Sequence, residues 1–92
     1  MPRVEVKLYT ILREAAGFKE TVVEGRTVGE ILNRLADRVG GKFRSMLFED
    51  DGRLNKFYIV LLNGRNIVLS KGLDTPVSNG DVIAIFPPVG GG

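Results

Sequence analysis

The last seven residues, Phe86-Pro87-Pro88-Val89-Gly90-Gly91-Gly92, are the stretch of this chain whose residue types could take part in chemistry. Glycine has no side chain, so Gly91 and Gly92 could pass a constriction that a Cβ atom would obstruct. Gly90 would add reach, and the carboxylate of Gly92 would be the reacting group. Because a free carboxylate is a poor electrophile, a partner would first have to activate it.

The two prolines favour a functional tail over a frayed chain end. Pro87 and Pro88 fix φ at about −65° and lack amide protons, so a paired strand cannot continue past Phe86. They are expected to keep residues 87–92 as a flexible but extended tail, which limits the entropy lost when the tail enters a partner. Glycines at a chain terminus are usually disordered. A tail without a function would not need two prolines that stiffen its base, so the prolines favour a functional tail.

Residues 81–86, rich in Val, Ile and Phe, predict the strand from which this tail departs. Period-two alternation places Phe86 on the face of Ala84 and opposite Ile85, without deciding which face is buried. Phe86 is therefore either a core residue or an exposed anchor for a partner. We favour the anchor, because aromatic residues are enriched at interface hot spots.

Composition restricts the other kinds of chemistry. The 92 residues fit one domain, 1–92, and 43% hydrophobic with 26% charged residues is ordinary for a globular protein. Cysteine and histidine are absent, which excludes disulfides, thiol catalysis and a Ser-His-Asp triad. No apolar run approaches the roughly 20 residues of a membrane span, and the N-terminus lacks a signal-peptide core, so we expect a cytoplasmic protein.

The charges are dispersed along the chain. A net charge of +2 without a Lys/Arg block gives weak support for nucleic-acid binding. The acidic cluster at 49–51 lacks the ligand spacing of a calcium loop, so no metal site is expected. Arg13, Arg65 and Lys71 could surround the tail and meet acidic groups of a partner, although solvated surface charge is the commoner role for each.

The first half of the chain predicts two strands and a helix. Residues 3–9 alternate apolar and polar, and 19–24 are rich in β-branched residues, so they are expected to form an antiparallel pair. Residues 11–17 between them are too short for a predicted helix and are interpreted as a turn with one helical loop. A capping box at Thr27 and Glu30 then opens a helix whose apolar stripe extends to Val39, with Gly40 and Gly41 ending it. Glu30 and Arg34 form a favourable i,i+4 pair.

The second half is less regular. Residues 42–56 are expected to hold a short helical turn followed by an exposed turn. Residues 57–62 are almost continuously apolar, as in a strand that is buried on both faces or meets a partner on its outer face. Asn63 and Gly64 predict a tight turn before a short strand at 67–69, and residues 72–80 are expected to be loop.

Together these elements predict an α+β fold with a mixed sheet of four to five strands and one main helix on one face. The first and last strands would lie side by side in the middle, with a right-handed crossover through the helix. This is the β-grasp, or ubiquitin-like, arrangement.

The end of the chain resembles the small subunit of molybdopterin synthase, a β-grasp sulfur carrier with a Gly-Gly terminus. The resemblance lies in Phe-Pro-Pro-Val-x-Gly-Gly at 86–92, the Leu-Arg-Glu at 12–14 and the Asn-Gly turn at 63–64. The chain is also similar, less closely, to the thiamine-pathway sulfur carrier and to ubiquitin-like modifiers. It departs from the pattern between about residues 40 and 57.

The resemblance implies a function as a sulfur carrier in molybdopterin biosynthesis. An adenylating enzyme related to ubiquitin-activating enzymes would use ATP and a sulfur donor to convert the Gly92 carboxylate to a thiocarboxylate. The large synthase subunit would then receive that sulfur on a pterin precursor. The residues implied for partner binding are Phe86, Pro87, Pro88, Val89 and Gly90, with Gly91 and Gly92 at the reaction centre. The chain itself would bind no cofactor and would act as a non-catalytic, sulfur-donating subunit.

Alternatives use the same activated carboxylate. The chain could be a protein modifier joined through Gly92 to lysines of target proteins, or a sulfur carrier for thiamine or tRNA thiolation. The paired prolines favour the molybdopterin type, because thiamine carriers usually lack them. A β-grasp interaction module with an idle tail is a further alternative, since fold alone does not determine function.

Overall fold

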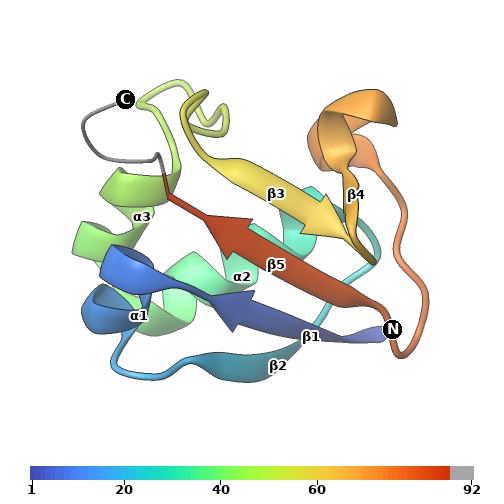
Figure 1. The fold of residues 1–92 in the computed structure, drawn as a ribbon, viewed down its shortest axis with the longest axis horizontal. Coiled ribbons are helices and arrows are strands. Elements are labelled where there is room, and N and C mark those ends of the chain that lie inside the picture. The colour runs from blue at the N-terminus through green and yellow to red at the C-terminus, as the bar shows by residue number, and fades with distance from the viewer. Residues whose placement is uncertain (88–92) are drawn as a thin grey trace.

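A mixed sheet with the strand order β2-β1-β5-β3-β4 forms one layer of the protein (Figure 1). The structure, a computed structural model, describes residues 1–87. Its strands are β1 (Arg3–Leu8), β2 (Glu20–Glu24), β3 (Ile59–Leu62), β4 (Arg65–Asn66) and β5 (Val82–Phe86). As expected, β1 pairs with β2 antiparallel, and β1 and β5 lie side by side as parallel strands at the centre of the sheet. The architecture is the predicted β-grasp.

Three helices accompany the sheet in the described part of the chain: α1 (Thr10–Ala16), α2 (Val28–Val39) and α3 (Gly41–Leu47). Figure 1 shows α2 behind the sheet, with α1 and α3 near the end of the sheet where β5 finishes. Alternate residues of the central strands, such as Val6 and Ile85, are fully buried in one core cluster with Ile31 and Leu35 of α2. The core therefore lies between α2 and one face of the sheet.

The N-terminus of α2 forms largely as its sequence predicts. Thr27 is the N-cap, and its Oγ1 accepts the Glu30 amide proton over 3.1 Å. The Glu30 carboxylate, however, accepts from the Arg26 amide at 2.7 Å and not from Thr27. The expected Glu30–Arg34 ion pair is also absent among residues 1–87, because Glu30 serves the helix start instead.

Two segments in which at most a helical turn was expected form complete short helices. The region 11–17 lies in α1, where Leu12 is fully buried and Gly17 ends the helix with φ of 85°. Residues 42–48 lie mostly in α3, which buries Phe43 and Leu47 against the core. Both helices are short, and tertiary burial of one or two side chains stabilises them more than their local propensity does.

The prediction of a strand at 67–69 was wrong. After the tight turn at Asn63 and Gly64, the strand β4 pairs Arg65 with Leu62. Residues Ile67–Leu69 then form a 3₁₀ helix, because the Asn66 side chain accepts the Val68 amide proton and turns the chain away from the sheet. The expected loop at 72–80 begins with a second 3₁₀ turn, Gly72–Asp74.

Candidate functional site

The end of β5 is the base of the predicted tail. This strand has β1 on one side and β3 on the other, so its backbone is paired along both edges up to Ile85, and Phe86 is paired with Ile59 of β3. Pro87 follows and is the last residue that the structure describes. Pro88, Val89, Gly90, Gly91 and Gly92, to which the sequence assigned partner binding and the terminal chemistry, lie outside the described residues.

Phe86 lies on the sheet face opposite α2. Ile83 and Ile85 are fully buried in the core, whereas Phe86 is half-buried on the other face. Its ring stacks on that of Tyr9, with centroids 4.5 Å apart and planes inclined by 9°. Such a stacked aromatic pair is favourable beyond its buried area. The side chain is thus not a core residue, which leaves it available to a partner.

We call the sheet surface opposite α2 the open face. It consists of the outward residues of the central strands: Glu5, Lys7, Ile59, Leu61, Ala84 and Phe86. The register places Ile59 opposite Phe86 and Leu61 opposite Ala84. Ile59 is 45% exposed, and the nearby Phe57 is 63% exposed. The almost continuous apolar run of β3 is explained by this second, uncovered face.

A basic hollow adjoins the aromatic pair. The guanidinium of Arg13 lies 5.7 Å from the centre of the Tyr9 ring, within the range of a cation–π interaction, and its Nε donates to the Leu8 carbonyl at 3.4 Å. A cavity of about 180 Å³ beside it is lined by Lys7, Leu8, Tyr9, Arg13, Lys19 and Glu20. Lys7 is paired with Glu5 at 3.7 Å, which leaves Arg13 and Lys19 against Glu20. The remaining positive charge favours acidic groups on a partner.

The structure separates the three basic residues that the sequence placed around the tail. Arg13 lies near Phe86, because its guanidinium contacts the Tyr9 ring that stacks on Phe86. Arg65, however, pairs with Leu62, whose neighbour on β5 is Ile83 at the far end from Phe86. Lys71 follows in the segment between the two 3₁₀ turns. Neither Arg65 nor Lys71 therefore lies at the base of the tail.

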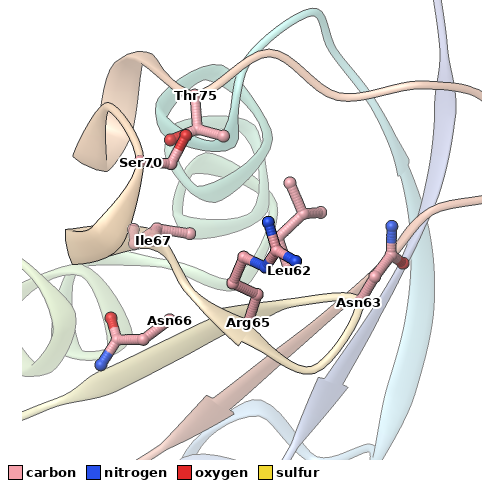
Figure 2. A pocket seen from close by; sticks show the side chains of 7 residues that line it. All are labelled: Leu62, Asn63, Arg65, Asn66, Ile67, Ser70 and Thr75. Atoms are coloured by element: carbon pink, nitrogen blue, oxygen red, sulfur yellow. The ribbon is translucent and has the colours of Figure 1, made fainter.

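A second hollow lies at the end of the sheet away from Phe86, and most of its polar side chains form hydrogen bonds within the protein. Figure 2 shows this cavity of about 310 Å³, lined by Leu62, Asn63, Arg65, Asn66, Ile67, Ser70 and Thr75. Asn63 donates to Asp81, and Asn66 caps the 3₁₀ helix that begins at Ile67. Thr75 Oγ1 accepts from the Lys71 amide. These bonds hold the loops in place, so Asn63, Asn66 and Thr75 have structural roles.

Sequence reasoning missed Tyr9 as part of the site. Its position in the alternation of β1, two residues after Lys7, was a signal that it faces away from the core. Its partner Phe86 could not be identified, because the predicted neighbourhood of the first and last strands does not give their register or the face on which Phe86 lies. Among residues 1–87, no group of acidic side chains is placed to hold a metal ion. None of the helices in this part of the chain has the length and apolar composition of a membrane span.

Comparison with known proteins gives relatives of the same size and fold. The small archaeal modifier protein 1 of Methanosarcina acetivorans is 38% identical, with a TM-score of 0.89 over 100% of this chain and 98% of that one. The small archaeal modifier protein 3 of Haloferax volcanii is 33% identical over 92 residues, covering 97% of this chain and 98% of the relative.

A third relative was solved with a partner. The crystal structure of the BexX/CysO complex of Amycolatopsis orientalis contains a chain that is 33% identical, with a TM-score of 0.85 over 97% of this chain and 99% of that chain. The ThiS family model matches residues 6–92, which include the glycines beyond the described part of the structure. The chain belongs to the ThiS family of ubiquitin-like sulfur carriers.

Proposed function

We propose that this protein carries sulfur as a thiocarboxylate at Gly92 and delivers it to the pterin precursor in the large subunit of molybdopterin synthase. The observation that supports a docked tail is the Tyr9–Phe86 stack, which stands on the open face where β5 ends. The motif Phe86-Pro87-Pro88-Val89 supports the molybdopterin pathway in particular. The family match extends to Gly92, which supports Gly91 and Gly92 as the reacting end.

The chemistry requires an enzyme that the chain itself does not supply. The Gly92 carboxylate attacks the α-phosphorus of ATP and releases pyrophosphate, which leaves an acyl adenylate. Hydrosulfide released by a sulfur donor then attacks the acyl carbon and displaces AMP, and loss of the remaining S–H proton leaves the thiocarboxylate. We assign both steps to a ubiquitin-activating-type adenylating enzyme, so that ATP and the sulfur donor are used through that partner and no cofactor is bound here.

The open face is the docking surface that we assign to these partners. Ile59 and Leu61 lie beside Ala84 and Phe86 in the register of β3 and β5, so their side chains form one apolar surface next to the tail. Burying it would contribute on the order of 25 cal/mol per Å² before the entropy of association is subtracted. The positive hollow around Arg13 would meet acidic residues at the rim.

A second candidate function is protein modification through Gly92. The identities of 38% and 33% to small archaeal modifier proteins 1 and 3 favour it. The acyl adenylate would then react with a lysine amine of a target instead of a sulfur donor. Sulfur delivery to thiamine or tRNA differs from the main proposal only in the acceptor.

Intact mass spectrometry separates these functions. The full chain is incubated with ATP, a sulfur donor and the host's adenylating enzyme, and the deletion of Gly92 serves as control. Exchange of one oxygen for sulfur adds ~16 Da, and this species should disappear when the large subunit and pterin precursor are added.

Two other results would change the conclusion. A tail-dependent mass increase equal to another protein would establish the modifier. A stable ~16 Da adduct that reacts with a tRNA or thiamine acceptor but not with the pterin precursor would reject the molybdopterin pathway while retaining sulfur carriage.

A further inference from the structure

The outer edge of β2 is open to another strand. β2 lies at the end of the sheet order and has β1 as its neighbour (Figure 1). The Leu8 amide donates to the Lys19 carbonyl at 2.8 Å, and the Gly25 amide donates to the Pro2 carbonyl at 3.1 Å. Antiparallel pairs bond through alternate residues, so the amide and carbonyl groups of Val22 point away from the sheet.

The opposite edge of the sheet offers much less. It is formed by β4, which has two residues and leads into the 3₁₀ helix at Ile67–Leu69. β2 has five residues, and by the same alternation the backbone groups of Glu20 and Glu24 also point outward. An unpaired edge of this length is a template for strand addition.

A side chain, and not another strand, bonds the centre of this edge. Nη1 of Arg38, on α2, donates to the Val22 carbonyl and to Thr21 Oγ1, each at 3.2 Å. Arg38 is an exposed residue of α2. Its guanidinium can therefore turn toward an incoming carboxylate and leave the Val22 carbonyl free to accept an amide proton.

A basic groove runs between this edge and α2. The cavity has a volume of about 250 Å³ and is lined by Arg3, Val22, Val23, Glu24, Arg34 and Arg38. Arg34 and Arg38 are one helical turn apart on α2. Within residues 1–87, none of the ion pairs involves Arg3, Arg34 or Arg38. The groove is thus lined by three arginines and a single carboxylate, that of Glu24.

We propose that the β2 edge and this groove bind an extended acidic peptide segment of a partner protein by strand addition. The peptide backbone would bond to Val22, and carboxylates on alternate residues would meet Arg34 and Arg38. This site is distinct from the open face and the tail, and it goes beyond sulfur transfer.

The chemistry of the peptide follows from the two sides of the strand. Alternate side chains of an added strand point to opposite faces of the sheet. Those on the α2 side meet the arginines, where charge-assisted hydrogen bonds to carboxylates are favourable. Those on the other side lie beside Val22, which is 44% exposed, and between Glu20 and Glu24. Small apolar residues fit there, and carboxylates do not.

The probe is a blocked peptide of sequence Asp-Val-Glu-Val-Asp, titrated into the ¹⁵N-labelled full chain and followed by amide chemical shifts. We expect saturable shifts centred on Val22 and its neighbours in β2 and on α2 near Arg38. Affinity should fall as salt is raised. The charge-reversed peptide Lys-Val-Lys-Val-Lys is the matched control, and equal binding of both peptides would overturn the proposal.

Exposed arginines allow a test that does not endanger the fold. Arg34→Glu and Arg38→Glu are each expected to weaken binding of the acidic peptide by ~10-fold or more. Arg65→Glu makes the same charge change at the far end of the sheet and should leave the affinity unchanged.

Three results would reject the proposal. They are a lack of saturable shifts, shifts centred on Ile59 and Phe86 instead of β2, or self-association of the free chain through β2 in sedimentation experiments. Loss of peptide binding does not depend on the chemistry at Gly92, so this test and the mass-spectrometric test can fail separately.

Discussion

The ring of Tyr9 lies parallel to that of Phe86, with their centroids 4.5 Å apart, although the two residues are separated by nearly the whole chain. The stack is possible because β1 and β5 are parallel neighbours, so that both strands finish at the same end of the sheet. This relationship fixes where the tail leaves the domain. It also joins an aromatic surface to the cation of Arg13.

Replacing either aromatic residue should slow activation of the tail more than it destabilises the fold. Phe86→Ala and Tyr9→Ala each remove a stacking interaction of about 0.5–1.5 kcal/mol and part of the open face. We expect the rate of thiocarboxylate formation at low protein concentration to fall ~10-fold, as for an interface anchor. The measurement is a steady-state assay with the adenylating enzyme, in which KM should rise more than kcat falls.

The matched control for this prediction is Val68→Ala. Val68 is apolar and 77% exposed but lies in the 3₁₀ helix beyond β4, away from Phe86. It should behave as the wild type in the same assay. A folded Phe86→Ala protein with unchanged KM would show that the ring is not a docking anchor.

Two helical glycines should respond in opposite ways to alanine. A Cβ added at Gly29 would lie 2.9 Å from the Leu73 carbonyl oxygen, whereas one at Gly41 would meet no atom within 4 Å. Gly29→Ala should therefore lower the free energy of unfolding by about 1–3 kcal/mol despite better helix propensity. Gly41→Ala should leave it unchanged or raise it by up to about 1 kcal/mol. Urea denaturation of both variants measures these changes in the free energy of unfolding. Equal changes in the two variants would contradict the close packing of α2 on Leu73.

The N-cap of α2 should contribute measurably to stability. Thr27→Ala removes the oxygen that accepts the Glu30 amide proton, and such a loss destabilises a protein by about 0.5–2 kcal/mol. Thr27→Ser keeps the hydroxyl and is the control that should retain most of the stability. The test is thermal unfolding followed by circular dichroism. If serine and alanine destabilise the protein equally, the hydroxyl is not the stabilising group.

Ionisation of Tyr58 should lower the free energy of unfolding at alkaline pH. Partial burial raises the pKa of its phenol above the ordinary value of 10.0. Well below pH 10 the phenol is protonated in both the folded and the unfolded chain, so it does not make the stability depend on pH. As pH rises from about 10 toward the folded pKa, the unfolded chain loses the proton first, and stability declines.

Tyr58→Phe should remove this part of the decline. Denaturation midpoints at pH 9 and pH 11 can be compared between the variant and the wild type, with the pH values chosen on either side of the ordinary tyrosine pKa of about 10. The wild type should lose more stability over this interval than the variant. An identical loss in both proteins would mean that Tyr58 does not carry the effect.

Much of the framework is determined by local sequence. Alternation in residues 3–8 is enough to place Val4, Val6 and Leu8 on a buried face, because side chains of a strand point to opposite sides. The Thr27 hydroxyl and the apolar stripe that follows it specify α2, because a cap and a 3.6-residue period are local properties. The two prolines and the glycines likewise determine the chemistry expected of the tail.

The tertiary structure decided the remaining features. Burial of Leu12 and Phe43 made complete helices of two segments whose short local patterns predicted at most a helical turn. The face of Phe86 and its contact with Tyr9 depend on the pairing of β1 with β5, and the position of Arg38 over the β2 edge depends on how α2 packs. These are relations between residues distant in the chain. The order of the elements places the first and last strands side by side, but local periodicity carries no information about their register or about how α2 packs, so these contacts are determined only when the core closes.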